Sequence, residues 1–357
     1  MGGTRRTTSG APRDSASSRA RCPQASPPNP STARPPISPT VDSRTARIRT
    51  VGPALRVLVT GGAGFFGSHV VDALLARGDQ VLVVDDLSTG DRANLDGRAE
   101  LRVADVSDRG ALERALAGER IGGVVHCAAK TKVVESMEKE ELYRDVIVRG
   151  TENVVGLARQ TGASIFVNIS TGGAIYGETP VCAEENTPVD PRSNYGRFKA
   201  QAEQIVAGSR MPAVSLRLAN IYGPRQRRDL EGGVIAIFIE CWKRRRSITM
   251  FGDGRYERDY VYVGDVVEAV VAALGGKWTG VYNIGTGVAT SVNDLVRELT
   301  ALLGAPPGVT HAPPRPAEVL RGCVDPSKAA REDLWRPRTG LRDGLRRTAR
   351  AEGALPG

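Results

Sequence analysis

A glycine-rich stretch in the first third of the chain has the residue types of a phosphate-binding turn. It runs from Thr60 to Gly67 as TGGAGFFG and contains the spacing Gly-x-Gly-x-x-Gly. A β-branched run precedes it and an apolar pattern of helical period follows it, as a dinucleotide-binding turn requires. Glycines let the backbone approach a pyrophosphate, and the following helix N-terminus favours its negative charge. The stretch therefore predicts a dinucleotide site and not a merely structural turn.

An acidic residue follows at the distance that this fingerprint requires. Asp85 ends the next apolar run, 80–85, about 20 residues beyond the turn. Its carboxylate would accept hydrogen bonds from the adenosine ribose hydroxyls and would repel a 2′-phosphate. We therefore expect NAD as the cofactor in preference to NADP.

Tyr195 and Lys199 have the spacing Tyr-x-x-x-Lys. Residues four apart on a helix lie on one face. A nearby cation stabilises a phenolate and would lower the tyrosine pKa from about 10 towards the working pH. Alone the pair could be a surface contact, but downstream of a dinucleotide turn it predicts a general base.

The cysteines and histidines offer little material for a metal site or a hydrolytic triad. No two cysteines have the CxxC spacing, and no two histidines are close in the sequence. We therefore predict no metal, no disulfide framework and a reducing, cytoplasmic location. Each histidine is expected to be a packing or surface residue. The residues concerned are Cys22, Cys127, Cys182, Cys241, Cys323, His69, His126 and His311.

The formal net charge of +9 arises mostly in residues 1–52, which hold nine arginines and two aspartates. Few large apolar side chains occur there, so ordering the segment would cost entropy with little burial. The second basic run, Lys243–Arg246, follows an apolar stretch and has no aromatic residues interleaved among its charges. It therefore indicates a solvated helix end and no nucleic acid partner. No apolar run reaches the roughly 18 to 20 residues that span a bilayer, so we expect no membrane partner.

Apolar strand-like runs alternate with helical patterns from residue 56 to about residue 220. The runs are 56–60, 80–85, 100–103, 123–126, 164–170 and 213–218, with helical patterns at 68–77, 152–161 and 198–208. Such alternation predicts an α/β fold of the Rossmann type, a doubly wound parallel sheet buried on both faces. Beyond residue 220 the pattern is irregular, with a later strand-like run at 281–284.

Three parts of the chain are expected from these patterns. Residues 1–52 form a disordered tail, and residues 53–220 form an NAD-binding Rossmann domain. Segments of about 258–287 return to that domain. A smaller, interleaved and discontinuous C-terminal lobe over 221–350 is expected to bind the substrate.

Taken together, a series of motifs in order along residues 55–350 resembles the short-chain dehydrogenase/reductase superfamily. The longer match is to its extended branch, the NAD-dependent nucleotide-sugar epimerases and dehydratases. Besides 60–67 and 195–199, the motifs are DDLSTG at 85–90, ADV at 104–106, HCAA at 126–129, GTEN at 150–153, STGGAIYG at 170–177, NIYGPRQ at 220–226, GDG at 252–254, RDYVYV at 258–263, YNIGTG at 282–287 and RPAE at 315–318.

The resemblance implies a third catalytic residue, a Ser or Thr at the end of the strand that precedes the tyrosine helix. Dehydratases follow it with Asp-Glu, whereas here Thr171 is followed by Gly172 and Gly173. Dehydration, which needs a carboxyl acid and base, is therefore disfavoured. Counted back from Tyr176, the usual Ser/Thr position falls on Gly172. Either Thr171 substitutes through a shifted backbone, or Tyr195 handles the proton alone.

The resemblance also implies the residues that bind each ligand. Those expected to hold NAD are Gly61, Gly64, Phe65, Phe66, Gly67, Asp85, Asp86, Leu87, Asp105, Val106, Ala128, Ala129, Lys130, Tyr195 and Lys199. Those expected to hold a nucleotide sugar are Thr171, Gly172, Gly173, Asn220, Val234, Thr249, Arg258, Arg315 and Glu318. The two arginines suit diphosphate oxygens because their forked donors match them.

Two positions depart from the family pattern. Ile147 stands three residues before the Gly-Thr pair at 150–151, where the family commonly has Asn. Lys130 directly follows the HCAA motif at 126–129, where the family usually has a polar residue. Lys130 could contact the cofactor or an acidic sugar such as a hexuronate, or it could be solvated.

The leading hypothesis is an NAD-dependent nucleotide-sugar 4-epimerase that acts on UDP-glucose or UDP-glucuronate through a transient 4-keto sugar. The alternatives are a net nucleotide-sugar oxidoreductase or dehydratase, an epimerase acting at another carbon, and a non-catalytic dinucleotide-binding regulator. A homodimer is expected, as in relatives. The sequence does not specify the sugar, the nucleotide or the pathway.

Overall fold

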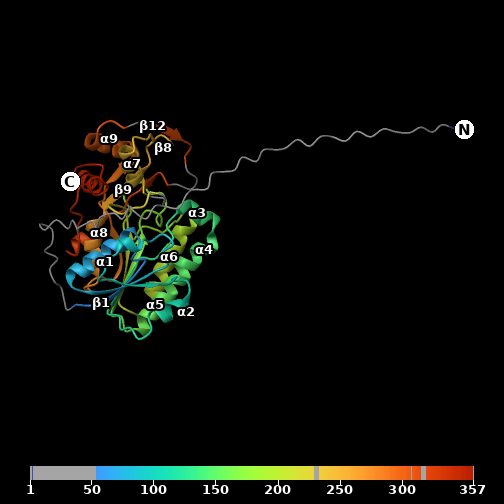
Figure 1. Cartoon of the computed structure of the whole chain (residues 1–357), viewed down its shortest axis with the longest axis vertical. Helices are drawn as coiled ribbons and strands as arrows, with labels where there is room; N and C mark the ends of the chain where they lie inside the picture. The colour runs from blue at the N-terminus through green and yellow to red at the C-terminus, as the bar shows by residue number, and fades with distance from the viewer. Residues whose placement is uncertain (1, 3–53, 229–232, 307, 315–318, 357) are drawn as a thin grey trace, which may run out of the picture. The chain divides into compact units, whose positions relative to one another are not determined.

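A computed structural model describes residue 2 and residues 54–228, 233–306, 308–314 and 319–356 (Figure 1). The predicted tail over 1–52 lies outside these residues, apart from residue 2. The described residues from 54 onward form one compact unit.

A seven-stranded sheet forms the centre of this unit, with strand order β10-β6-β5-β4-β1-β2-β3 and every neighbouring pair parallel. The strands are β1 (Arg56–Thr60), β2 (Gln80–Asp85), β3 (Glu100–Val103), β4 (Gly123–His126), β5 (Ile165–Thr171), β6 (Ala213–Leu218) and β10 (Gly280–Ile284). The predicted parallel Rossmann-type sheet is confirmed. Its order reverses between β1 and β4, the point where such sheets bind ligands.

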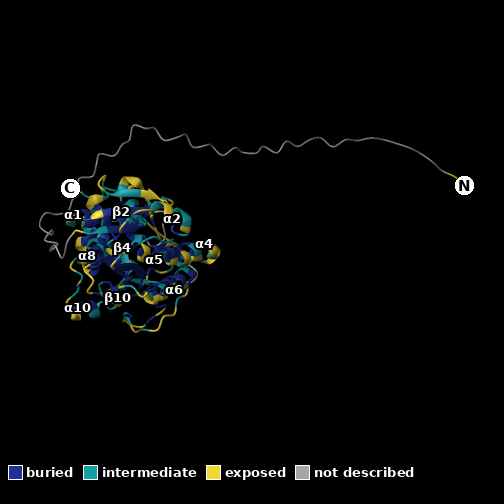
Figure 2. Cartoon of the chain, turned by 90° about the horizontal axis from the view of Figure 1, so that it is seen from below, coloured by how far each residue is buried: buried dark blue, intermediate teal, exposed yellow. Residues whose placement is uncertain are grey.

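Successive side chains of a strand point to opposite faces of the sheet, and here the side chains on both faces are apolar. Helices therefore cover both faces. Val57 and Val59 of β1 pack with α1 (Phe65–Arg77) and α8 (Val263–Ala273). Leu58, between them, packs towards α2 (Arg109–Ala115), α5 (Gly150–Gln160) and α6 (Asn194–Gly208). Figures 1 and 2 show the two groups of helices with the buried sheet between them.

Smaller sheets lie beyond the carboxyl ends of the main strands. β9 (Glu257–Tyr262) pairs with β7 (Asn220–Tyr222), β11 (Ala289–Ser291) and β13 (Arg321–Gly322). β8 (Ile248–Phe251) pairs with β12 (Val309–Ala312). A separate apolar core includes Tyr222, Phe238 and Leu295, and it packs α7 (Val234–Lys243), α9 (Val292–Leu303) and α11 (Leu341–Ala351) together.

Short elements complete the described chain. They are η1 (Arg92–Asn94), α3 (Val133–Glu138), α4 (Glu140–Arg144), the π-helical turn η2 (Asp145–Arg149) and α10 (Ser327–Arg331). The strand-like run at 281–284 lies in β10 and joins the main sheet beside β6, whereas β9 belongs to the smaller sheet.

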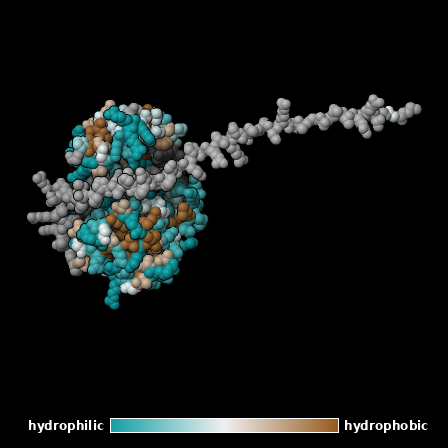
Figure 3. Space-filling view, in the orientation of Figure 1, coloured by the Kyte–Doolittle hydropathy of each residue, from teal (hydrophilic) through white to brown (hydrophobic). Residues whose placement is uncertain are grey.

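The surface in the view of Figure 3 is mostly hydrophilic, and hydrophobic residues form separate patches on it. Among the residues with a described position, no helix combines the length and the apolar character of a membrane span. The same residues hold no group of three or more His, Cys, Asp or Glu side chains placed to hold a metal ion.

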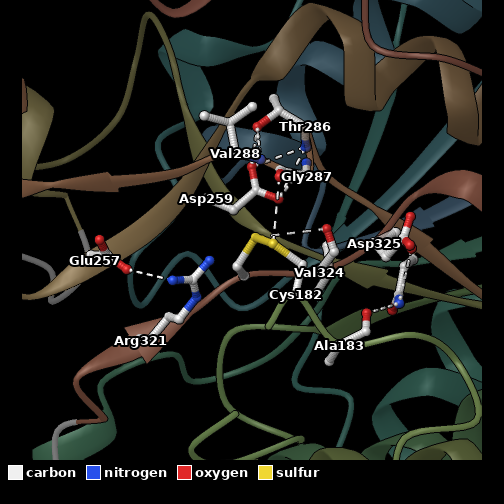
Figure 4. The surroundings of a disulfide bond; sticks show 12 residues. Cys182, Ala183, Glu257, Asp259, Thr286, Gly287, Val288, Arg321, Val324 and Asp325 are labelled. Atoms are coloured by element: carbon white, nitrogen blue, oxygen red, sulfur yellow. Dashed lines mark hydrogen bonds and ion pairs between the residues drawn. A yellow bond between two sulfur atoms is a disulfide. The ribbon is translucent and has the colours of Figure 1, made fainter. Parts of the chain in front are cut away.

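Cys182 and Cys323 form a disulfide, so the prediction of no disulfide is wrong for this pair. The two residues are 141 positions apart, and sequence spacing gives no sign of their contact. An isolated parallel bridge between Ala183 and Val324 brings the segments together. Figure 4 shows the disulfide where the two segments lie side by side, below Asp259.

Candidate active site

A cavity of about 420 Å³ opens at the carboxyl ends of β1, β2, β4, β5 and β6. It lies at the reversal of strand order, where the general rule for open α/β sheets places a ligand. Residues from the predicted cofactor group and the predicted substrate group both line it. The structure therefore brings the two sets of motifs into one site.

The glycine-rich turn is built for close contact between backbone segments. Gly61 has φ +68°, and a Cβ atom there would lie 2.8 Å from the Ala128 Cα. A Cβ at Gly67 would lie 2.2 Å from the Gly61 carbonyl oxygen. Gly64 is the N-cap of α1, has no side-chain capping bond and lines the cavity, so the positive end of the helix faces the cavity. This cradle fits the pyrophosphate of a dinucleotide.

Asp85 holds the turn and faces the cavity at the end of β2. Its Oδ2 accepts a hydrogen bond from Ala63 N at 2.9 Å, and its Oδ1 accepts one from Leu87 N at 2.8 Å. Burial raises the pKa of this carboxyl, and the two backbone donors oppose that rise. The carboxylate is therefore fixed where a ribose hydroxyl would donate to it.

Lys130 points towards the residues that follow β2. Its Nζ donates to Ser88 Oγ at 2.7 Å and lies 3.7 Å from the carboxylate of Asp86. The ammonium thus has partners on the side of Asp85, at the predicted adenosine end of the cavity. This placement gives no support to a role in binding an acidic sugar.

Tyr195 and Lys199 lie one turn apart on α6 and both line the cavity. Ser193 caps this helix by accepting a hydrogen bond from Gly196 N, so α6 begins before the predicted 198. The side chain of Tyr195 is hydrogen-bonded to Thr171, the last residue of β5. The three predicted catalytic residues therefore meet in one place.

The protonation of this pair differs from the expectation. Burial raises the pKa of Tyr195 to about 12, and the hydrogen bond with Thr171 opposes the rise. Burial lowers the pKa of Lys199 to about 8, against the charges of Cys127 and Glu203. The prediction of a lowered tyrosine pKa is thus wrong for the protein chain alone. The physical reason is that desolvation of the phenolate outweighs the hydrogen bond with Thr171. The Lys199 ammonium instead donates from Nζ to Ile169 O at 2.8 Å.

The predicted substrate residues are only partly brought together. Gly173, Asn220 and Arg258 line the cavity with Thr171, and a Cβ on Gly173 would lie 3.2 Å from Asn220 Oδ1. The Arg258 guanidinium donates to the backbone of Glu257 at 2.8 Å. This group therefore forms part of the cavity wall.

Other predicted residues lie elsewhere. Gly172 packs against Val324, whose Cγ1 would be 2.3 Å from a Cβ on the glycine. Val234 packs against the core of α7 and α9, and Thr249 is exposed on β8 beside Thr310. Leu87 is outside the lining but donates to Asp85. Arg315 and Glu318 lie outside the described residues. All remaining predicted cofactor residues line the cavity.

Sequence reasoning missed several lining residues, among them Arg192, Gln226 and Arg227. Ser193 is a residue type that caps helices, and this signal in the sequence places its neighbour Arg192 at the start of α6. Arg227 donates to Thr89 O at 2.9 Å, and both residues line the cavity. That contact joins residues 138 positions apart and has no local sequence signal.

Two histidines have packing roles, as expected. His126 is buried between Thr60 and Thr151, with ring nitrogens at 2.7 Å and 3.1 Å from their hydroxyls. Burial lowers its pKa to about 3, so the ring is neutral. His69 lies against Pro224 O, and burial lowers its pKa to about 4.

Comparison with known proteins gives consistent matches. The NAD dependent epimerase/dehydratase family matches residues 57–285. The UDP-glucose 4-epimerase of Mycolicibacterium smegmatis is 37% identical over 305 residues, which cover 82% of this chain and 97% of that protein.

Solved structures match in the same way. The UDP-glucose 4-epimerase of Thermus thermophilus, in complex with NAD, is 41% identical with a TM-score of 0.80, over 84% of this chain and 100% of that one. The UDP-glucose 4-epimerase of Thermotoga maritima, with UDP-glucose, is 37% identical with a TM-score of 0.80, over 84% and 98%.

Proposed function

The chain belongs to the NAD dependent epimerase/dehydratase family, and from that premise we propose that it interconverts UDP-glucose and UDP-galactose by inverting carbon 4. The observation that carries the proposal is the meeting of Thr171, Tyr195 and Lys199 in the cavity that holds the dinucleotide turn. The relatives named above are UDP-glucose 4-epimerases, and one of them was crystallised with UDP-glucose.

NAD fits the residues present. At Gly61 and Gly67 a side chain would collide with neighbouring backbone atoms, so the turn presents only its backbone to a ligand. At the end of β2, the Asp85 carboxylate is held by a hydrogen bond from Ala63 N. When bound, NAD supplies the hydride acceptor and a positively charged ring, and it is restored in each cycle.

Tyr195 is the proton carrier in this proposal. It removes the proton from the C4 hydroxyl and later returns it to the same oxygen. Because burial raises the pKa of Tyr195, the phenolate needs the hydrogen bond from Thr171 and the charge of Lys199. The small residues Gly173 and Ala174 line the cavity and leave space beside these groups, which suits a sugar that must present both faces.

The positions of the carboxylates favour epimerisation over dehydration. The described cavity lining has its carboxylates at Asp85, Asp86 and Asp105, at or just beyond the ends of β2 and β3. In that lining the residues after Thr171 are Gly173 and Ala174, so no acid and base for removing water stand beside the phenol.

UDP-glucuronate is the second candidate substrate. One observation favours it, because the guanidinium-bearing residue Arg192 lines the cavity three positions before Tyr195. An arginine can pair with a sugar carboxylate through two parallel hydrogen bonds. We infer in addition a homodimer and a cytoplasmic location from the family resemblance alone, since the Cys182–Cys323 disulfide removes the argument from cysteine composition. Sedimentation velocity tests the first, and fractionation of the source cells tests the second.

The proposed activity is tested by incubating the purified protein with UDP-glucose or UDP-glucuronate and following the C4 configuration by proton NMR. Galacto products without accumulating NADH would support the proposal. Stoichiometric NADH would indicate a net oxidoreductase, and a new configuration at another carbon would indicate a different epimerase. A protein that binds NAD and converts neither sugar would favour a regulator.

A further inference from the structure

Helix α6 contacts the last residues of β5 with three successive turns. Tyr195 reaches Thr171, and one turn later Lys199 donates to the carbonyl of Ile169. Residues four apart on a helix share one face, so the position one further turn along faces the same strand end. That position is Glu203, which the catalytic motif does not include.

Glu203 is hydrogen-bonded to the residue directly before Thr171. Its Oε1 accepts the hydroxyl of Ser170 at 2.5 Å. Both side chains are buried, with 7% and 4% of their surfaces exposed. Water is therefore largely excluded from this contact, and the carboxylate fixes the strand end at its penultimate residue.

The carboxylate is itself held rigidly by Arg217 of β6. The guanidinium donates Nε–H to Oε1 at 2.9 Å and Nη2–H to Oε2 at 2.6 Å, a forked pairing with fixed geometry. Nη1 donates to the Tyr176 hydroxyl at 2.8 Å, and that hydroxyl donates to Asn283 Oδ1 at 2.7 Å. This buried network therefore ties α6 to β5, β6 and β10 beneath the cavity.

We propose that Glu203 is a positioning residue for the 4-epimerase reaction, acting through Ser170 to keep the Thr171 hydroxyl within hydrogen-bond reach of Tyr195. The proposal rests on the proposed function. Small displacements at a reacting centre are costly, since a shift of about 1 Å can slow a reaction about 100-fold.

The test compares two serine-to-alanine variants that each remove one buried hydrogen bond to β5. Ser170→Ala removes the contact with Glu203, and Ser215→Ala removes the contact with Asn168, which is 3.1 Å long and lies earlier on the strand. Steady-state kinetics with UDP-glucose, NAD content and Tm are measured for each. Ser170→Ala should lower kcat about tenfold with KM changed less than about twofold, whereas Ser215→Ala should change kcat less than about twofold.

A double-mutant cycle separates positioning from general destabilisation. If Ser170 acts through Thr171, adding Ser170→Ala to a Thr171→Val variant should lower kcat less than about twofold further. Glu203→Gln should lower kcat at least as far as Ser170→Ala. Because Glu203→Gln leaves the buried Arg217 with an uncharged partner, this variant can fail to fold. In that case Ser170→Ala carries the test.

The two claims fail in different ways. An active wild-type enzyme in which the two serine variants behave alike, or in which Ser170→Ala and Thr171→Val have additive effects, would overturn the role of Glu203 and leave the proposed function standing. A wild-type protein that does not interconvert UDP-glucose and UDP-galactose would overturn both claims.

Discussion

The side chains of Thr171 and Tyr195 are hydrogen-bonded to each other although they come from β5 and α6. Counting along the family motif puts the usual serine or threonine at Gly172, but Gly172 packs against Val324 and does not line the cavity. The contact therefore favours the view that Thr171 takes the place of that residue. It also explains how a site with a displaced threonine keeps a hydroxyl beside the phenol.

Replacing Thr171 tests this contact directly. Thr171→Val removes the hydroxyl at nearly constant volume and should lower kcat about 10- to 100-fold, because one hydrogen bond to a charged group contributes about 1.5–3 kcal/mol. Thr171→Ser keeps the hydroxyl and serves as the matched control. Its kcat should stay within about fivefold of the wild type. Equal activity of the valine and serine variants would show that Tyr195 handles the proton alone.

Asp85 should determine the preference for NAD over NADP. Asp85→Asn removes the negative charge that would repel a 2′-phosphate. We therefore expect the dissociation constant for NADP, divided by that for NAD, to fall about 10- to 100-fold. Asp96→Asn is the control, because it removes a carboxylate that pairs with Arg98 and does not line the cavity. Isothermal titration with both dinucleotides measures the ratio. An unchanged preference in Asp85→Asn would contradict this role.

Much of the fold could be predicted because its signals are local. The run at 80–85 and strand β2 coincide, and the glycine spacing at 60–67 and the Tyr195–Lys199 pair both describe short segments with strict backbone demands. Contacts between distant segments had no such signal. Arg227 reaches Thr89, and Ala183 pairs with Val324, only because the tertiary fold brings them together. The pKa of Tyr195 could not be predicted either, since burial of the phenol depends on the whole cavity.

The Cys182–Cys323 disulfide should stabilise the folded protein when oxidised. A cross-link between residues 141 positions apart stabilises by about 2–5 kcal/mol, mostly by restricting the unfolded chain. The double variant Cys182→Ser/Cys323→Ser should therefore unfold at lower urea than the oxidised wild type, and reduced wild type should match the variant. Cys241→Ser alters a free cysteine and is the control. Identical unfolding of oxidised and reduced wild type would contradict the disulfide.

His126 should make stability depend on pH in a defined window. Its folded pKa is lowered to about 3 from 6.5, so as the pH falls the unfolded chain binds the proton first and stability is lost below about pH 6.5. Between about pH 7 and pH 5 the loss from this residue is about 2 kcal/mol. His126→Gln should flatten the dependence of the unfolding free energy on pH over that range, measured by urea titration. His69, with a pKa lowered to about 4, keeps a similar dependence in the variant. Parallel curves for the two proteins would contradict the assignment.

The most direct test of the account follows a deuterium atom at carbon 4. The protein is incubated with UDP-glucose labelled with deuterium at C4, and the UDP-galactose formed is analysed by NMR and mass spectrometry, with Tyr195→Phe as the matched control. We expect the label to stay at C4 of the inverted sugar without net NADH, and we expect the phenylalanine variant to be slower by about 1,000-fold while it still binds NAD. Loss of the label to solvent, or full activity in Tyr195→Phe, would contradict a hydride that is taken and returned at a site whose proton carrier is Tyr195.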